Sequence, residues 1–474
     1  MRDGERMDTT PITVPKAAPA PLPALASYLE PFAPLFLRSQ SRASLERYLT
    51  GLLTDLPRKN CDAIAAAVAG TSTERLQHLL TDADWDALAL DRQRVQRLTA
   101  ASPPGGVLVL DDTGLPKQGT HSVGVARQYS GTLGRTANCQ IVVSAEYLAE
   151  PTKSRPIHWP VSAQLYLHRS WADDPARCAR AHVPEDVSFQ TKPALALRLI
   201  DRARDWGVPF ATVVADAGYG ENPPFLLGLE ERGLAYVCGV PSSFGVRQPD
   251  EVSAAAVTPP PAYQGRGRPR LPRPAPLYTV ANRAAALPAD AWQVVNWREG
   301  SKGPLRKQFA ALRVHWATGS PVAGQSERSV HDARVRTAPE GWLLVERPVP
   351  GEDGETKYYL SNLPADTPLR RLVLLAHSRW VVEQFYEDAK GECGLDEYQG
   401  RRWDGLHRHL ALVMLAYSFL VWVRLKPPAE GGLSPLRSRP DVPRPPSPHP
   451  RAAAPRLDRV APRYRPTQGL QASA

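Results

Sequence analysis

The spacing of apolar and polar residues divides the chain into a helical beginning, a strand-rich middle and a helical end. In residues 26–100, apolar side chains such as Leu45, Leu49 and Leu52 recur at intervals of three or four among polar and charged ones. This periodicity is that of amphipathic helices and predicts a small all-α domain. Three strands are predicted next, from short apolar runs at 107–112, 138–148 and 162–168.

The following segment alternates helices with strands. A helical pattern at 192–206 precedes a buried strand at 211–216, and a short helix at 223–233 precedes another strand at 234–240. The resulting order, βββαβαβ, is that of the ribonuclease-H-like fold, a mixed α/β sheet. In such a sheet the first and fourth strands lie side by side and parallel.

The remainder of the folded chain is predicted from weaker patterns. Between 241 and 355, Pro- and Gly-rich stretches separate scattered strands at 309–317 and 341–349, with no convincing helix, and this predicts an inserted β-rich subdomain. A strand at 357–361 then precedes a long helix near 369–390 and another near 405–425.

Six segments follow from these elements. They are a disordered N-terminal segment at 1–25, a helical domain at 26–100, the first part of the ribonuclease-H-like domain at 101–240, the β-rich insertion at 241–355, the helical end of that domain at 356–426, and a disordered Pro/Arg-rich tail at 427–474. The tail holds 12 prolines and eight arginines and has too little apolar content to fold. A frame-shifted end is the alternative.

Charge and composition restrict the partners and the compartment. Lys and Arg together number 58 against 48 Asp and Glu, a net charge of +10 that favours a polyanion such as nucleic acid, although a GC-rich gene also enriches arginine. The five cysteines are far apart and form no CxxC pair, so neither a zinc knuckle nor a disulfide framework is indicated. The longest apolar run, at 410–423, is too short to span a bilayer and predicts a buried helix. We therefore expect a cytoplasmic protein without membrane contact.

Aspartates stand at the ends of the two strands that the fold places side by side. The first strand ends in Asp111-Asp112 and the fourth in Asp216. An aspartate after a strand often only begins a turn, but two at paired strand ends become neighbours. A third acid is expected from the helix after the insertion, where Arg379, Glu383, Glu387 and Lys390 share one helical face. The alternative for that face is a solvated stripe of ion pairs.

Three converging carboxylates repel one another unless cations neutralise them. Mg²⁺ prefers oxygen ligands, and two ions about 3.5–4 Å apart could be bridged by one aspartate and completed by the other two acids. Such a pair of Mg²⁺ ions, for which Mn²⁺ would substitute, is suited to phosphodiester chemistry. One ion activates the attacking water or 3′-hydroxyl, and the other stabilises the leaving oxygen.

These residues resemble the motifs of the DDE insertion-sequence transposases. The resemblance is to the cut-and-paste group whose third catalytic acid lies in a Tyr-x2-Arg-x3-Glu-x6-Lys signature. Arg379, Glu383 and Lys390 have the spacing of that signature, while Ala376 stands where its tyrosine would be. The segments 107–140, 213–220 and 379–396 also resemble one branch of these enzymes, in the same order over residues 35–425.

The resemblance implies a site. By position, the catalytic and metal-binding acids fall on Asp112, Asp216 and Glu383. Adjacent residues of a strand point to opposite faces, so only one of Asp111 and Asp112 can face the metal ions, and the choice of Asp112 rests on the motif. Arg379 and Lys390 are implied to contact the DNA phosphate near the cleavage site.

The resemblance also implies a reaction and partners. The expected protein is a bacterial transposase that binds terminal inverted repeats, cleaves DNA by two-metal hydrolysis and transfers the 3′-OH into target DNA. It would act as a homodimer on double-stranded DNA, in the cytoplasm at the nucleoid. The helical segment 26–100 would bind the element ends, with phosphate contacts from Arg38, Arg42, Arg47, Arg58 and Lys59.

Alternative interpretations remain for individual motifs and for the whole chain. Arg266-Gly267-Arg268-Pro269 has the form of a minor-groove AT-hook, or of a basic linker. Trp292 or Trp297 could stack on a flipped base, although core packing is favoured. A catalytically inactive, transposase-derived DNA-binding protein is the alternative function, suggested by Ala376 and the tail. A phosphotransferase of the haloacid-dehalogenase type is disfavoured because its chemistry needs Asp-x-Asp.

Overall fold

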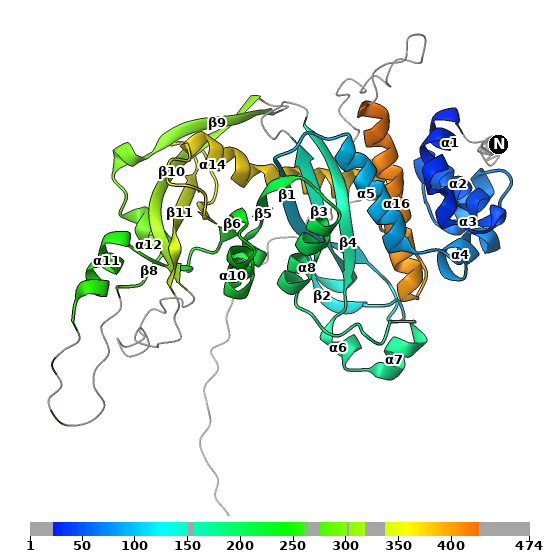
Figure 1. The fold of residues 1–474 in the computed structure, drawn as a ribbon, viewed down its shortest axis with the longest axis horizontal. Coiled ribbons are helices and arrows are strands. Elements are labelled where there is room, and N and C mark those ends of the chain that lie inside the picture. The colour runs from blue at the N-terminus through cyan, green and yellow to red at the C-terminus, as the bar shows by residue number, and fades with distance from the viewer. Residues whose placement is uncertain are drawn as a thin grey trace, which may run out of the picture. The chain divides into compact units, whose positions relative to one another are not determined.

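A computed structural model of the chain describes residues 22–149, 156–259, 262, 265, 275–300, 303–317 and 337–425. All of these residues belong to one compact unit (Figure 1). Most of the predicted N-terminal segment, the predicted tail at 427–474, and Arg266 and Arg268 of the candidate AT-hook lie outside the described residues.

The first part of the described chain is helical, as its periodicity predicts. Its elements are α1 (Pro23–Leu29), η1 (Glu30–Leu35), α2 (Ser39–Leu53), α3 (Cys61–Ala67), α4 (Thr73–Thr81) and α5 (Ala87–Ala100). The side chains of Asn60, Ser72 and Asp86 cap three of these helices by accepting backbone N–H bonds. The apolar faces of α2, α4 and α5 pack against α16 (Trp403–Leu425).

The predicted central strands are present, and the first and fourth of them are parallel neighbours as expected; one further strand, at Ala126–Ser130, was not predicted. β1 (Gly106–Pro116) pairs antiparallel with β3 (Arg135–Ala149) and parallel with β5 (Phe210–Ala215), and β5 pairs parallel with β6 (Ala235–Val240). On its other side β3 pairs with both β2 (Ala126–Ser130) and β4 (Ile157–Tyr166). The order β4-β3-β1-β5-β6 is a mixed sheet consistent with a ribonuclease-H-like domain.

Helices connect the later strands of this sheet. After β4 come α6 (Arg169–Ala172), α7 (Pro175–Arg180) and α8 (Lys192–Asp205); α9 (Ala217–Gly220) and α10 (Pro223–Glu231) lie between β5 and β6. The predicted helix at 192–206 and strand at 211–216 therefore differ from the observed elements by one residue at their ends.

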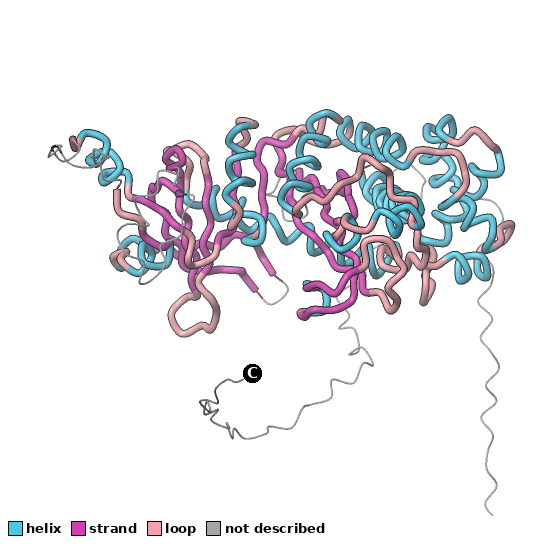
Figure 2. Tube along the Cα trace, turned by 90° about the horizontal axis from the view of Figure 1, so that it is seen from below, coloured by secondary structure: helices cyan, strands magenta, loops and turns pink. Residues whose placement is uncertain are grey.

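The strands of the 241–355 segment continue the same sheet. They are β7 (Gly245–Arg247), β8 (Tyr278–Thr279), β9 (Gln293–Gly300), β10 (Gly303–Ala317) and β11 (Thr337–Arg347). The join is made by β12 (Lys357–Ser361), which pairs antiparallel with β6 on one side and β11 on the other. The segment also holds α11 (Pro249–Val257), α12 (Val280–Ala285) and η3 (Ala289–Ala291), so the expectation of no convincing helix is wrong for α11. Figure 2 shows these strands and those of the central sheet in magenta.

The C-terminal helices correct two predictions. The single helix expected near 369–390 is interrupted: α14 (Leu369–Ala376) ends in a 3-10 turn, η4 (His377–Arg379), before α15 (Trp380–Cys393) begins. The interruption falls where His377 contacts a buried carboxylate. The apolar run at 410–423 is part of the 23-residue helix α16, which is long and apolar enough to cross a membrane. Its apolar window is 72% buried inside the protein, which is typical of a core helix.

Candidate active site

The two adjacent aspartates of β1 point to opposite faces of the sheet. In the register with β3, Asp111 lies opposite Ser144 and Asp112 opposite Val143. Asp111 accepts a hydrogen bond of 2.6 Å from Nη1 of Arg379, on the face that α15 covers. Asp112 lies on the face that α8 covers, because Lys192, the first residue of α8, places its Nζ 3.0 Å from Asp112 Oδ1.

The second oxygen of Asp112 is also engaged within the protein. The hydroxyl of Tyr219 donates to Asp112 Oδ2 over 3.2 Å. Both carboxylate oxygens of Asp112 therefore have protein donors, one from α8 and one from α9. Asp111 differs. Among the described residues its Oδ1 accepts a hydrogen bond from the backbone N–H of Asp112 alone, over 2.8 Å, and its Oδ2 accepts from Arg379, the residue before α15.

Asp216 lies at the end of the strand beside β1. The last paired residues of β1 and β5 are Leu110 and Ala215, so Asp111 and Asp216 come next on two parallel strands. Asp216 also begins a turn, since its Oδ1 accepts the N–H groups of Gly218 and Tyr219 at 2.9 and 3.3 Å. The turn-forming and the site-forming interpretations of this aspartate are thus compatible.

The turn after Asp216 packs closely on β6. A Cβ atom on Gly220 would lie 1.9 Å from the carbonyl oxygen of Gly239. Only glycine fits at this contact, which explains Gly220 and holds α9, with its Tyr219, against the sheet.

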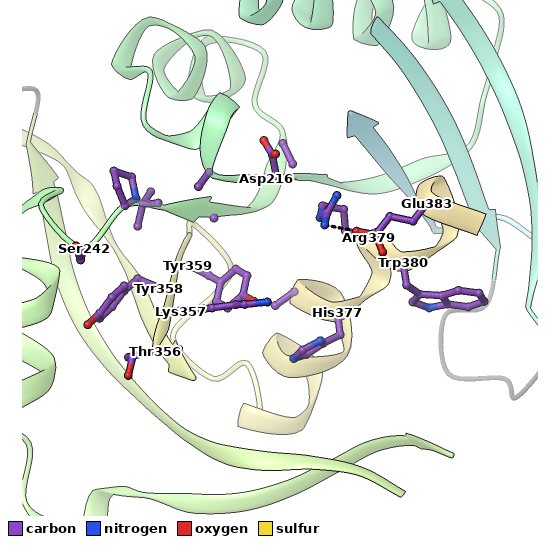
Figure 3. A pocket seen from close by; sticks show the side chains of 16 residues that line it. Asp216, Ser242, Thr356, Lys357, Tyr358, Tyr359, His377, Arg379, Trp380 and Glu383 are labelled. Atoms are coloured by element: carbon purple, nitrogen blue, oxygen red, sulfur yellow. Dashed lines mark hydrogen bonds and ion pairs between the residues drawn. The ribbon is translucent and has the colours of Figure 1, made fainter. Parts of the chain in front are cut away.

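Glu383 lies on α15 and is linked to the strand ends by its contact with Arg379. Nη2 of Arg379 donates to Glu383 Oε1 one helical turn away, while Nη1 holds Asp111. The Glu383 side chain is 58% exposed and lines a cavity of about 650 Å³ together with Asp216 and Arg379 (Figure 3). We call this space the site cavity; its other walls come from β6, β12 and η4.

Burial and like charges act on these acids. Burial raises the pKa of Asp111 to about 7, although Arg379 opposes the effect, and burial likewise raises the pKa of Asp216 against the charge of Arg379. Within the described chain, no three His, Cys or carboxylate side chains already surround a point where a metal ion would fit. The guanidinium of Arg379 pairs with both Asp111 and Glu383.

The donor set nevertheless suits divalent cations. Asp111, Asp216 and Glu383 offer carboxylate oxygens, which Mg²⁺ prefers.

Lys390, implied by the signature to contact a phosphate, also reaches β1. Its Nζ donates to Thr113 Oγ1 over 2.7 Å and to the carbonyl of Gly114 over 3.2 Å, and burial lowers its pKa. Asp111 and Thr113 share one face of the strand, so Arg379 and Lys390 both face β1. Arg379, the last residue of η4, and Lys390 of α15 therefore both contact the end of β1.

Other residues singled out from the sequence make structural contacts. Trp297 stacks flat on His377 with ring centroids 3.9 Å apart, and the guanidinium of Arg347 lies 3.6 Å over Trp292. These contacts fit the packing interpretation of both tryptophans. Lys59, expected among the phosphate contacts of the helical segment, is buried and donates to the carbonyls of Leu52 and Thr54, so it is wrong as a surface contact.

Sequence reasoning missed a buried carboxylate beside the site. Glu346 of β11 is 1% exposed; Lys307 Nζ lies 2.8 Å from its Oε1, and His377 Nε2 lies 3.1 Å from its Oε2. The hydroxyl of Tyr359 donates to the same Oε2 over 3.0 Å. Glu346 of β11 thus contacts β10, β12 and the turn that carries Arg379. The sequence signal that could have indicated it was a single acidic residue directly after the apolar run Leu343–Val345.

Comparisons with known proteins identify the family of the chain. The family model described as "DDE superfamily endonuclease" matches residues 31–304, more than half of the chain, and the "Transposase DDE domain" model matches residues 190–419. The chain belongs to the DDE superfamily of endonucleases. It is similar to a probable transposase for insertion sequence element IS701 from Microchaete diplosiphon, with 27% identity over 231 residues. That match covers 48% of this chain and 57% of the relative's length.

Proposed function

We propose that this protein is the transposase of a bacterial insertion sequence and that it cuts DNA at the element ends. The observation that carries the proposal is the arrangement at the carboxyl ends of β1 and β5. There Arg379 holds Asp111 and Glu383 together, with Asp216 on the neighbouring strand, in a chain that belongs to the DDE endonucleases. The Arg-Glu-Lys spacing further supports the subgroup with the Tyr-Arg-Glu-Lys signature.

Asp111, Asp216 and Glu383 would hold Mg²⁺, with Mn²⁺ as a substitute and two ions per site. The bound cations would supply an activated oxygen nucleophile and stabilise the leaving oxygen. The protein's own residues would position these carboxylates. Arg379 orients Glu383 against Asp111, Tyr219 and Lys192 fix the neighbouring Asp112, and Lys390 holds the end of β1 on α15. Arg379 is also placed to pair with a DNA phosphate when the carboxylates are neutralised.

The arrangement favours Asp111 over Asp112 as the acid of β1. Asp111 lies on the face covered by α15, which carries Glu383, whereas Asp112 points to α8 and is bound by Lys192 and Tyr219. The motif alone favours Asp112. Because the two residues are adjacent and chemically identical, each serves as the matched control for the other.

The test is a cleavage assay on a labelled duplex that carries the inverted repeats flanking the gene, with Mg²⁺, Mn²⁺ or EDTA. We expect metal-dependent cutting at the repeat boundary. Asp111→Asn should abolish it while the duplex is still bound, because the amide removes the charge that the cations require. Asp112→Asn should retain cutting, reduced by about 10- to 150-fold at most, the effect of one charged hydrogen bond of roughly 1.5–3 kcal/mol.

The reverse pattern, with Asp112→Asn inactive and Asp111→Asn active, would return the metal-binding role to Asp112. Absence of metal-dependent cutting by the unmodified protein would contradict the proposed function as a whole. Both variants should be compared by circular dichroism, so that loss of activity is not confused with loss of fold.

A catalytically inactive, DNA-binding derivative is the second candidate. Ala376 favours it, because this residue lines the site cavity at the position where the signature has a tyrosine. Binding of the end duplex without cutting in either metal would support this candidate.

The proposal extends to strand transfer into target DNA and to a homodimer on DNA in the cytoplasm, at the nucleoid. The helices α1–α5 are the proposed end-binding part; Arg38 and Arg47 line a cavity of about 420 Å³ there, together with Arg75 and His78. Gel filtration with and without end duplex tests the dimer. An active monomer in both conditions would contradict it.

A further inference from the structure

The site cavity has walls of different character. Asp216 and Glu383 lie at its acidic side, beside Arg379 (Figure 3). The side formed by β12 and the loop after β6 offers instead the ammonium of Lys357 and the hydroxyl groups of Ser242, Thr356 and Tyr358. A cation and neutral donors facing a cluster of acids across about 650 Å³ suit a ligand that is itself anionic and extends away from the acids.

Three residues with basic side chains line the cavity, and two of them have acidic partners. Arg379 uses both Nη atoms on Asp111 and Glu383. His377 lies 3.1 Å from Glu346 and stacks on Trp297. Lys357 is different, since among the described residues no carboxylate lies within ion-pair distance of its Nζ.

The absence of a partner for Lys357 has a structural cause. In the register of β11 with β12, Lys357 lies directly opposite Glu346, where a cross-strand ion pair would be expected. The Glu346 carboxylate is instead taken by Lys307, His377 and Tyr359. Lys357 is exposed and extends from β12 into the cavity, toward the turn that carries His377 and Arg379 (Figure 3).

We infer that Lys357 binds a backbone phosphate of the DNA, next to the phosphate that is cut. This inference rests on the proposed function and adds a contact that the Arg-Glu-Lys motif does not contain. A lysine acts on a phosphate as a point charge and without base specificity, so the contact positions the strand in the cavity and does not read its sequence.

The first test measures binding of the end duplex at several salt concentrations by the full chain and its variants. The binding constant falls as salt rises, and loss of one phosphate contact makes the plot of log K against log salt less steep by about 0.9. The variant's loss of affinity relative to the unmodified protein is then roughly eightfold larger at 0.1 M salt than at 1 M salt. We expect this change for Lys357→Ala and its rescue by Lys357→Arg. Arg204→Ala is the matched control, because Arg204 is an exposed cation in the last turn of α8 outside the cavity.

The second test identifies the contacted phosphate. Single phosphates near the cleavage site are replaced in turn by neutral methylphosphonates, and each duplex is bound to the unmodified protein and to Lys357→Ala. At one position beside the cleavage site, the losses from the variant and from the neutral linkage should fail to add, because both remove the same contact. Inorganic phosphate at millimolar concentration should not compete with the duplex if the DNA strand is the ligand.

The inference is overturned if Lys357→Ala leaves the salt slope unchanged, if Arg204→Ala lowers it equally, or if the losses add at every position. Competition by inorganic phosphate alone would also overturn it, in favour of a free-anion site. These outcomes are distinct from failure of the proposed function, which is judged by metal-dependent cutting with the unmodified protein.

Discussion

Glu346 provides the sharpest test of how the extended sheet supports the site. The substitution Glu346→Gln keeps the size of the side chain and one oxygen acceptor but removes the negative charge. The amide cannot satisfy both Lys307 and His377, which are 26% and 19% exposed and so are only partly able to regain water. The variant is expected to lose stability and to loosen the turn that carries Arg379.

The magnitude follows from the pKa of Glu346. Burial alone would raise it, but the neighbouring His377 and Lys307 outweigh burial and lower the pKa from 4.5 to about 2. A tenfold change in acid strength corresponds to about 1.36 kcal/mol, so the charged contacts contribute about 3 kcal/mol to folding at neutral pH. This contribution is complete above pH 4.5. It is lost as the pH falls toward 2, and about half of it remains at pH 3.

Urea denaturation of the unmodified protein and of Glu346→Gln, between pH 7 and pH 3, measures this difference. The gap in unfolding free energy should be about 3 kcal/mol at pH 7 and should shrink by about half at pH 3. Glu340→Gln is the matched control on the same strand; its ion pair with Arg313 is exposed and should contribute less than about 1 kcal/mol. A gap below 1 kcal/mol at pH 7, or one that is constant down to pH 3, would refute the reasoning.

Two further predictions concern the buried polar groups behind the site. Arg94→Leu should lower the unfolding free energy by about 3–5 kcal/mol, because it leaves Asp91 buried without its ion pair and frees the carbonyl of Val161, and Asp91→Asn in the same chain should recover part of the loss in thermal melting. His409, fully buried against Tyr48, has a pKa that burial lowers to about 4, so its folded form resists protonation. Protonation of His409 should therefore cost the unmodified protein about 3 kcal/mol as the pH falls from 6.5 to 4, and urea midpoints at pH 7 and 5 should shift less in His409→Gln.

The sequence predicts those parts of the fold where one period dominates. The strand at 357–361 has the predicted ends, and the central order of strands follows from short apolar runs with clear borders. The prediction of one helix at 369–390 is wrong in the middle of that range, where a 3-10 turn interrupts it. In this turn His377 contacts Glu346, which lies on the distant strand β11. Such a tertiary contact leaves no periodic signal.

The strand ends and the helical face could be predicted from the sequence, and Arg379 links Asp111 at one strand end to Glu383 on that face. The catalytic and metal-binding roles of these acids stay a prediction. The choice between Asp111 and Asp112 was not predictable from periodicity, because the alternation of side chains along a strand does not say which face the later helix covers. Glu346 could not be predicted as part of the site, since its three partners come from three different elements.

The pairing of β12 between β6 and β11 limits how such a chain can be shortened or recombined. Residues 241–355 cannot be excised as a self-contained cassette, because β12, which follows them, would lose its outer neighbour. Tyr358–Ser361 would then present a row of unpaired N–H and C=O groups, the kind of exposed edge along which chains aggregate. Length can vary most safely at β8, the far margin of the sheet. Chimeras between relatives should therefore exchange the margin and retain the Tyr359–Gly239 register.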